Sequence, residues 1–207
     1  MRAKFITVEG LDGAGKTTHL AWLRQALETR GIAVCATREP GGTPLGETLR
    51  ALILDPRQSL APETEALLMF ASRQQHLDAV IRPALASGTW VLCDRFTDAS
   101  FAYQAGGSGV AWKKIEILEK WVQGDLEPDL TLYFDVDPRT AKARLDAIKS
   151  PDRFEQERQG FQERVRAAYL RRAREHPTRI RIIAGNVTIS EIQVKLEEMV
   201  LSLCPYA

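Results

Sequence analysis

The chain has little of what would place it among secreted, membrane-spanning or disulfide-stapled proteins. Its 207 residues include only three cysteines, Cys35, Cys93 and Cys204, which are scattered and lack C-x-x-C spacing. That usage argues against a disulfide framework and indicates a reducing compartment. No apolar run approaches membrane-spanning length, and we expect no signal peptide because the first residues lead directly into a strand. The sequence therefore predicts a cytoplasmic protein with no membrane partner.

An excess of charge of one sign is also missing. Lysine and arginine number 28 against 27 aspartates and glutamates, a net charge of +1, so no bulk attraction to nucleic acid is expected. The one asparagine, Asn186, precedes Val187, so the Asn-Lys-x-Asp motif with which GTP-driven switches read guanine is absent. These features disfavour both a GTP switch and an ATP-driven nucleic-acid motor.

What the chain does have is a regular alternation of apolar, β-branched segments with helical patterns. Five segments are expected to be buried parallel strands: Lys4–Glu9, Ile32–Thr37, Trp90–Asp94, Leu130–Asp135 and Arg179–Ile183. The alternation predicts an α/β fold with three layers, a five-stranded parallel sheet flanked by helices and joined by right-handed crossovers. Because no linker interrupts the pattern, we expect a single domain over residues 1–207.

Helices are expected between these strands. They span Thr18–Arg30, Glu63–Ser87 with a kink or restart at Pro83, Trp112–Gln123 and Phe154–Glu175, and a last helix opens with a capping box of Thr188 and Glu191. In such a sheet, ligands bind at the carboxyl ends of the strands.

The most specific motif, Gly-Leu-Asp-Gly-Ala-Gly-Lys-Thr, lies between the first expected strand and the first expected helix. This context favours a phosphate-binding loop, whose amides cradle phosphate oxygens, over a plain glycine turn. Lys16 would reach the β- and γ-phosphates, and the Thr17 hydroxyl would ligate Mg2+. The sequence therefore predicts a nucleoside triphosphate site with Mg2+, formed by Gly10, Leu11, Asp12, Gly13, Ala14, Gly15, Lys16 and Thr17.

Arginines follow the second and third expected strands. Arg38 opens the segment Arg-Glu-Pro-Gly-Gly-Thr, and a guanidinium fork grips a phosphate with two parallel hydrogen bonds. Asp94 and Arg95 end the third strand, where an aspartate commonly holds Mg2+ and the arginine would add a second phosphate grip. A solvated surface turn and an ordinary strand-end ion pair are the structural alternatives.

Two smaller groups suit a flat heterocycle. Phe70 and Arg73 share one face of an expected helix and could stack on and hydrogen-bond such a ring, although the sequence alone favours a core position for Phe70. Ser100, Tyr103 and Gln104 could line a short turn near a base and sugar, or could be structural.

Cations also crowd the stretch after the fourth expected strand: Arg139, Lys142, Arg144, Lys149 and Arg153. A solvated helix face is one interpretation. The other is a mobile lid, at about residues 138–155, that closes cations onto the transferring phosphate.

In this order and spacing, the motifs resemble the thymidylate kinase family over most of the chain. The segments that carry the resemblance are 9–18, 38–43, Arg73 before Gln75-His76, Asp94-Arg95-Phe96, Ala102-Tyr103-Gln104 and Asp152-Arg153-Phe154-Glu155. The resemblance implies the P-loop NTPase fold of the nucleoside monophosphate kinases. It also implies transfer of the γ-phosphate of ATP to dTMP in dTTP synthesis, with Mg2+ and as a homodimer.

The resemblance further implies roles for single residues. Lys16, Arg95, Arg153 and Asp12 would be catalytic, and Arg144 would join the ATP site. Asp12, Arg38 and Arg95 would lie at the acceptor phosphate and the 3′-hydroxyl. Around the nucleoside the resemblance places Phe70 stacked on thymine, Arg73 on a thymine carbonyl, Ser100 and Gln104 near the base, and Tyr103 where a ribose 2′-hydroxyl would go.

The phosphate loop has no arginine between Gly10 and Lys16. This is similar to the bacterial subgroup that supplies its catalytic arginine from the lid, for which Arg153 and Arg144 are the candidates. The stacking position four residues before Arg73 is held by Met69, so either Met69 or Phe70 would contact the base. A different P-loop kinase, acting on dUMP, dCMP, GMP or a nucleoside, is the main alternative.

Overall fold

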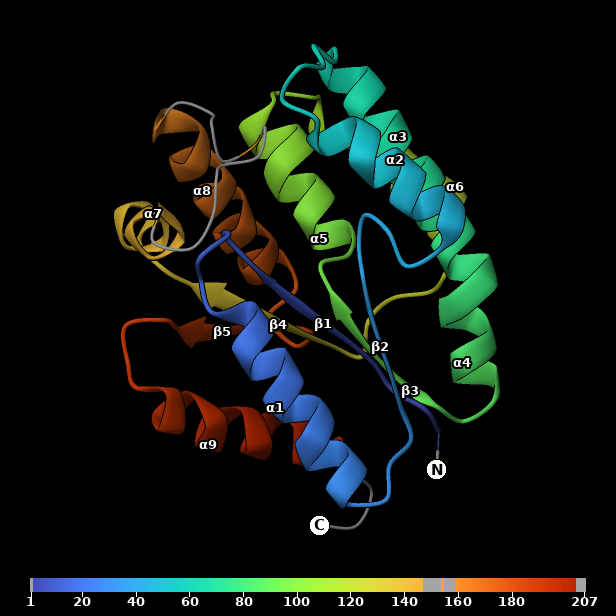
Figure 1. Cartoon of the computed structure of the whole chain (residues 1–207), viewed down its shortest axis with the longest axis vertical. Coiled ribbons are helices and arrows are strands. Elements are labelled where there is room, and N and C mark those ends of the chain that lie inside the picture. Colours follow the sequence, from blue (N-terminus) through green and yellow to red (C-terminus); the bar gives the residue numbers. More distant parts are fainter. Residues whose placement is uncertain (1, 147–153, 155–158, 204–207) are drawn as a thin grey trace.

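A computed structural model describes residues 2–146, 154 and 159–203 and shows a parallel sheet flanked by helices (Figure 1). The strands are β1 (Phe5–Gly10), β2 (Val34–Arg38), β3 (Trp90–Asp94), β4 (Leu130–Asp135) and β5 (Ile180–Ala184). Their order across the sheet is β2-β3-β1-β4-β5, and neighbouring strands run parallel. The five predicted strands are confirmed, with shifts of a residue or two at their ends.

Strand β1 lies at the centre of the sheet and is buried along its whole length. Its apolar, β-branched residues suit a strand that is covered on both faces. The register sets the carboxyl ends of three strands side by side, because Asp94 of β3 pairs with Val8 of β1 and with Arg38 of β2. The motifs that follow these strands are therefore brought to one edge of the sheet.

Helices and two π-helical segments connect the strands. They are α1 (Lys16–Thr29), α2 (Pro44–Leu54), α3 (Pro62–His76), η1 (Leu77–Ile81), α4 (Arg82–Ala86), α5 (Thr97–Ser100), η2 (Phe101–Gly107), α6 (Trp112–Gln123), α7 (Pro138–Asp146), α8 (Gln159–Glu175) and α9 (Ile189–Leu201). The predicted bounds of α6 are confirmed, as is the capping box of Thr188 and Glu191 at the start of α9. None of the helices in the described part of the chain has the length and apolar content of a membrane span.

Helix α2 was not predicted, although its start carries a clear signal. The Thr43 hydroxyl accepts a hydrogen bond from the amide of Gly46 at 3.0 Å, and Pro44 occupies the first turn. A threonine cap followed by proline is a frequent beginning for a helix.

The expected helix over Glu63–Ser87 is interrupted by a π-helical segment and restarts as α4 at Arg82, beside Pro83, as the sequence predicted. Helix α3 ends at His76 and is followed by η1, where the amide of Arg82 donates to the carbonyl of Leu77. Proline has no amide hydrogen and crowds the preceding turn. The wider π-turn is one way for a helix to accommodate such a disruption.

Two further expectations fall partly on residues that the structure does not describe. Helix α8 is described from Gln159, whereas the sequence predicted a helix from Phe154, and residues 155–158 lie outside the described part. Of the expected lid over residues 138–155, the described portion is α7 and Phe154.

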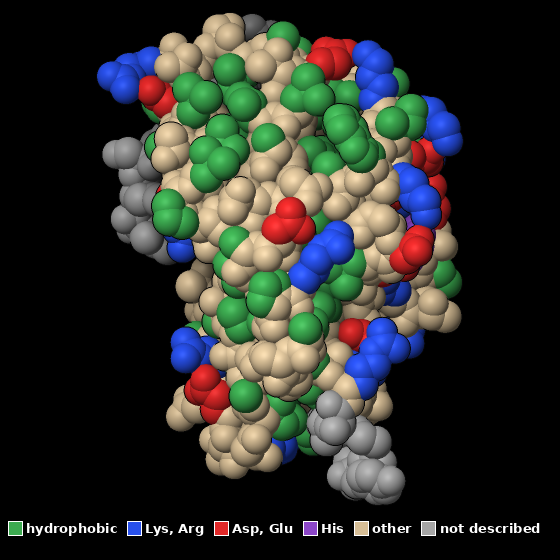
Figure 2. Space-filling view, turned by 90° about the vertical axis from the view of Figure 1, so that its right-hand side faces the viewer, with side chains coloured by type: hydrophobic (Ala, Val, Ile, Leu, Met, Phe, Trp, Pro, Cys, Tyr) green, Lys and Arg blue, Asp and Glu red, His purple; other side chains and the backbone are tan. Residues whose placement is uncertain are grey.

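An apolar patch, here called the α3–α6 patch, stands on the surface of these two helices. Leu67 is 55 % exposed, Ile117 57 % and Trp121 79 %. Between the helices lies a groove of about 250 Å³ lined by Glu63, Ala66, Leu67, Val110, Lys114, Ile117 and Leu118. Figure 2 faces this side of the molecule and shows hydrophobic side chains gathered on its upper part.

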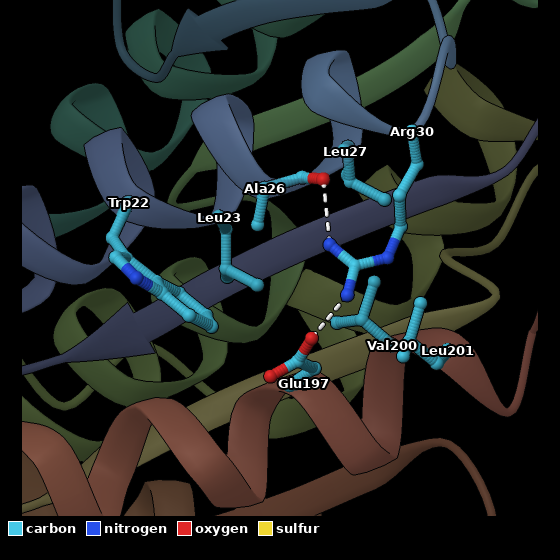
Figure 3. Close-up of a pocket in the computed structure, with 8 residues that line it drawn as sticks. All are labelled: Trp22, Leu23, Ala26, Leu27, Arg30, Glu197, Val200 and Leu201. Carbon is cyan, nitrogen blue, oxygen red and sulfur yellow. Dashed lines mark hydrogen bonds and ion pairs between the residues drawn. The ribbon is translucent and has the colours of Figure 1, made fainter.

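Helices α1 and α9 pack together (Figure 3). Leu23 and Leu27 of α1 and Val200 of α9 are buried around a small gap of about 10 Å³. At its edge, Arg30 donates to the carbonyl of Ala26 and forms an ion pair with Glu197. A partly exposed ion pair contributes little to stability. The packing of α1 against α9 is therefore stabilised mainly by the burial of apolar side chains.

Candidate active site at the carboxyl ends of the strands

The phosphate loop joins β1 to α1, and glycines at two of its positions are required by geometry. Gly13 has φ +80°, and a Cβ there would lie 2.1 Å from the carbonyl oxygen of Ala141. The backbone of α7 therefore packs directly against the loop. Gly15 has φ +91° and immediately precedes α1. Only glycine adopts such angles without strain, and the N-terminus of α1 at the end of this loop is a favourable place for an anion.

Lys16 is folded back onto the loop that precedes it. Its ammonium donates to the carbonyl oxygens of Gly10 at 3.1 Å and Leu11 at 2.9 Å, and lies 3.7 Å from an oxygen of Asp12. Burial and the nearby charge of Arg95 lower the pKa of this lysine. A poorly solvated cation held at the mouth of a phosphate loop is well placed to bind a phosphate oxygen.

The two expected Mg2+ ligands lie near this lysine. Thr17 is exposed at the start of α1, and the negative charge of Asp94 is close enough to act on the pKa of Lys16, in the upward direction. The Oδ1 atom of Asp94 is buried and has no hydrogen-bond partner among the described residues. An unpartnered carboxylate oxygen and a hydroxyl suit a hard cation, and magnesium in kinases takes most of its other ligands from phosphates and water. The residues present therefore fit the ion.

Arg95 is the centre of a hydrogen-bond network between the phosphate loop and α8. Its guanidinium donates to Asp12 at 2.9 Å and to the hydroxyls of Tyr103 and Tyr169, each at 3.1 Å. Its backbone has φ +69°, and its amide is held by the carbonyl of Val8 at 2.9 Å. A residue other than glycine keeps such an angle only where the surroundings enforce it, often at a functional site.

Behind Arg95 lies Glu9, a buried carboxyl group that sequence reasoning did not assign to the site. Tyr169 bridges the two residues, since it accepts from Arg95 and donates to Glu9 at 2.7 Å. The amide of Phe96 donates to the other oxygen of Glu9 at 2.7 Å. Burial and the charge of Asp98 outweigh these favourable contacts and raise the pKa of Glu9 to about 8. Glu9 therefore keeps its proton at neutral pH in the folded protein.

This shift predicts that stability falls as the pH rises from about 5 to about 8. In that range the folded chain keeps the Glu9 proton, whereas the unfolded chain loses it near the ordinary value of 4.5. The folded state then binds more protons, and one group contributes a slope of at most about 1.4 kcal/mol per pH unit. We expect Glu9→Gln to remove this contribution, as measured by urea unfolding at several pH values.

The exposed Glu175→Gln substitution on α8 serves as the control and should retain the pH dependence of the original protein. Identical pH dependence in the original chain and in Glu9→Gln would contradict the assignment.

Beside the phosphate loop lies a cleft of about 90 Å³, the arginine-lined cleft. Its lining residues are Asp12, Glu39, Pro40, Arg50, Leu54, Met69, Arg95, Ala99, Tyr103, Gln104 and Phe154. Of the residues predicted to bind an acceptor, four therefore line it: Asp12, Arg95, Tyr103 and Gln104. The other four, Arg38, Phe70, Arg73 and Ser100, do not.

Arg73 does not line the cleft but contacts Glu39, which does. Its Nε donates to Glu39 at 2.7 Å and its Nη2 to the Ser100 hydroxyl at 3.0 Å. His76 approaches the other oxygen of Glu39 at 3.0 Å. The Nη1 atom of Arg73 is buried and has no hydrogen-bond partner among the described residues. One donor of the guanidinium thus stays available.

The structure separates Met69 from Phe70, which the sequence left as alternatives. Met69 lines the cleft, whereas Phe70 is buried with Ala66, Phe101 and other apolar residues. The guanidinium of Arg73 lies 4.6 Å from the centroid of the Phe70 ring. Phe70 therefore supports Arg73 from the core side, and the methionine faces the cleft.

Arg50 is a cation of the cleft that sequence reasoning missed. It comes from α2 and donates to the carbonyl of Pro40 at 2.9 Å, while burial lowers its pKa. Arg38, by contrast, is half exposed and paired with Glu47 at 2.8 Å. Recognition of α2 and of the spacing between Thr43 and Arg50, two helical turns, would have found this residue.

The residues expected from the lid are placed only in part. Arg144 lies on α7 and donates to the carbonyl of Gly185 at 3.2 Å. Arg153 lies outside the described residues. Phe154 lines the cleft, with its ring edge against Tyr103 at 5.6 Å between centroids.

A parallel sheet with a phosphate loop after its central strand, and a cleft with two arginines beside that loop, defines a P-loop nucleotide kinase. A sequence model of the family described as thymidylate kinase matches residues 8–196. The chain belongs to the thymidylate kinase family.

Individual relatives agree with this assignment. The thymidylate kinase of Nitrosomonas europaea is 59 % identical over 199 residues, covering 96 % of this chain and 93 % of the relative. That of Paraburkholderia xenovorans is 57 % identical over 206 residues, covering 98 % and 99 %. The crystal structure of thymidylate kinase from Ehrlichia chaffeensis superposes with a TM-score of 0.78 at 32 % identity, covering 97 % of this chain and 99 % of that one.

Proposed function

We propose that this chain transfers the γ-phosphate of ATP to dTMP, giving ADP and dTDP, with ATP at the phosphate loop and dTMP in the arginine-lined cleft. The family assignment supports both substrates. The main structural support for this arrangement is the hydrogen bond from Arg95 to Asp12, which connects the cleft with the phosphate loop. The two phosphates would meet at this point. Three scattered cysteines, of which Cys35 and Cys93 are free thiols, support a cytoplasmic location.

The reaction needs no general base. A phosphate monoester has a second pKa of about 6 and is mostly ionised at neutral pH, so an oxygen of dTMP attacks the γ-phosphorus directly. A bond forms between that oxygen and phosphorus while the bond to the β-phosphate oxygen breaks, and ADP leaves. The obstacle is repulsion between two anions. Lys16, Arg50 and Arg95 would offset it, with Arg38 at the edge of the cleft.

Thr17 and Asp94 would hold Mg2+. When bound with ATP, the ion supplies charge that neutralises the β- and γ-phosphate oxygens. Arg144 and Arg153 are the candidates for a further cation near the transferring group, and one of them would close with the lid over residues 138–155. We also propose that residues 1–207 form a single domain.

The unpartnered atoms near the cleft fit the hydrogen-bonding edge of thymine. Arg73 has a buried donor without a partner, and Gln104 has a buried acceptor, Oε1, without one among the described residues. Thymine offers a carbonyl oxygen at C4 and a donor at N3, so the two sets are complementary. Met69, rather than Phe70, would cover the face of the base, and Tyr103 would fill the space beside the sugar.

A panel of acceptors tests the assignment. With ATP and Mg2+, coupled detection of ADP should show the highest kcat/KM for dTMP, and lower values for dUMP, dCMP and GMP. The low value for dCMP follows from the Arg73 donor and the Gln104 acceptor, since cytosine presents an amino group and an unprotonated nitrogen at the same two places. Uracil presents the same carbonyl and N3–H as thymine, so the lower value for dUMP rests on its missing 5-methyl group. A clear preference for an acceptor other than a thymine nucleotide would overturn the proposal.

We also propose that the chain forms a homodimer through the α3–α6 patch. Leu67, Ile117 and Trp121 expose an apolar surface around a groove, and such patches mark interfaces more often than solvated surface. A second copy related by a two-fold axis would cover the patch with itself.

Placing a charge in this patch is expected to give a monomer. Ile117→Asp would bury an unpaired carboxylate against apolar side chains, which costs several kcal/mol. Size-exclusion chromatography with light scattering measures the mass. The matched control is Val194→Asp on α9, which is equally exposed, 57 % for both residues, but lies away from the patch. A dimer that survives Ile117→Asp would rule out this interface.

A further inference from the structure

Gln104 reaches the arginine-lined cleft with its amide held in one orientation. The side chain is fully buried, and its Nε2 donates to Oε1 of Glu65 at 2.8 Å. An amide group can turn over and exchange its donor for its acceptor, and only its partner decides which is presented. Here the partner is a carboxylate.

An ionised carboxylate accepts hydrogen bonds but cannot donate one. Glu65 is 2 % exposed and lies in the first turn of α3, where the helix dipole favours negative charge. The hydroxyl of Ser108 also points at its Oε1, at 3.4 Å. Glu65 therefore forces the NH2 group of Gln104 toward itself and leaves the carbonyl oxygen facing elsewhere.

That carbonyl oxygen, Oε1, is buried without a hydrogen-bond partner in the described part of the chain. A buried acceptor without a partner costs free energy, and a ligand that brings a donor removes that cost. A pyrimidine with a hydrogen at N3 brings such a donor. Cytosine carries a lone pair at N3 and would face the oxygen with repulsion.

We propose that Glu65 is a specificity-determining residue that acts through Gln104: it locks the amide as an acceptor and so selects pyrimidines with N3–H over cytosine. This inference rests on the proposed function, since it places the acceptor base in the arginine-lined cleft. Glu65 itself does not line the cleft and is a positioning residue.

Glu65→Gln tests the idea, because the amide that it introduces can either accept from or donate to Gln104. The amide of Gln104 could then turn its NH2 group to the nitrogen of cytosine. We expect the ratio of kcat/KM for dTMP to that for dCMP to fall about tenfold or more. The ratio for dTMP to dUMP should stay constant, since uracil presents the same N3–H.

Both ratios are taken within one preparation, so the fraction of active protein cancels. The control is Glu175→Gln on α8, which also removes an ion-paired carboxylate and should change neither ratio. The exchange Glu65→Gln with Gln104→Glu retains a buried donor–acceptor pair and again turns only acceptors to the cleft. This double variant is expected to restore the preference for dTMP over dCMP.

The possible outcomes separate the two levels of the proposal. If Glu65→Gln leaves the dTMP-to-dCMP ratio unchanged, or lowers activity equally toward dTMP, dUMP and dCMP, then Glu65 is structural and the inference is wrong. If Glu65→Gln does not fold, failure of the double variant to prefer dTMP over dCMP overturns the inference. If the original chain does not phosphorylate dTMP, the proposed function fails and the inference fails with it.

Discussion

Lys16→Ala is expected to lower kcat/KM for phosphate transfer by on the order of 10³-fold, with little loss of folded protein. The ammonium is buried, and its present partners are backbone carbonyls of the phosphate loop and the carboxylate of Asp12. Bound phosphate oxygens would replace weak neutral acceptors with charged ones, and they gain most from a cation that water solvates poorly. Alanine has neither a positive charge nor a hydrogen-bond donor for the β- and γ-phosphates.

ADP release in a coupled assay measures the loss, and thermal unfolding shows whether the variant is folded. Lys195→Ala, which removes an exposed lysine of α9, should leave turnover unchanged. Near-normal turnover in Lys16→Ala would mean that the loop positions ATP without its lysine.

Arg95→Ala is expected to have an effect of similar size, on the order of 10³-fold, divided between a lower kcat and a higher KM for dTMP. Three side chains direct its guanidinium, those of Asp12, Tyr103 and Tyr169. Removing it takes away the proposed grip on the acceptor phosphate. It also removes one of the cations that neutralise the carboxylate of Asp12 beside two incoming anions.

Arg95→Lys separates charge from shape. A lysine keeps the positive charge but cannot make the parallel hydrogen bonds of a guanidinium fork. We therefore expect it to recover only a small part of the lost activity. Arg24→Ala, at an exposed ion pair of α1, is the control and should behave like the original chain. If Arg95→Ala kept the original KM for dTMP, Arg95 would not hold the acceptor.

The expected stability of the two variants differs for a physical reason. Removing the buried cation of Lys16 takes a donor away from the carbonyls of Gly10 and Leu11, and water can enter the space that the long side chain vacates. Removing the Arg95 side chain takes away three hydrogen bonds that help to hold a strained backbone angle, φ +69°, at which alanine is strained as well, so we expect this variant to be the less stable of the two. Thermal unfolding of both variants therefore belongs beside the kinetic measurements.

The sequence predicted the elements that have strong local signals. Neighbouring residues suffice to indicate the alternating apolar strands and helices, the capped last helix and the phosphate loop. These predictions correspond to the observed sheet and helices. The short elements α2, α5 and α7 were harder, because few residues carry their pattern and glycine or proline stands beside two of them. The predicted helix over Glu63–Ser87 was right in extent and in its restart beside Pro83, but the π-helical segment before the restart was not predicted.

Local motifs predicted the phosphate-loop half of the candidate site, and the family resemblance added Arg95, Tyr103 and Gln104 of the cleft. Asp12, Lys16 and Thr17 follow from one contiguous motif. The cleft beside it depends on residues that are far apart in the chain: Gln104 meets Glu65 across 39 positions, and Tyr169 meets Glu9 across 160. No local sequence pattern predicts such pairs, because each partner by itself looks like an ordinary residue of a helix or strand.

The sequence by itself determined that this protein binds a nucleoside triphosphate, and its ordered motifs indicated the family to which the chain belongs. Tertiary structure decided which side chains make the second pocket. One step along a helix turns a side chain by about 100°, so packing of α3 sends Met69 to the cleft and Phe70 to the core. Packing likewise brings Arg50 to the cleft and directs the amide of Gln104, because burial leaves each polar group only the partners that the fold places within reach.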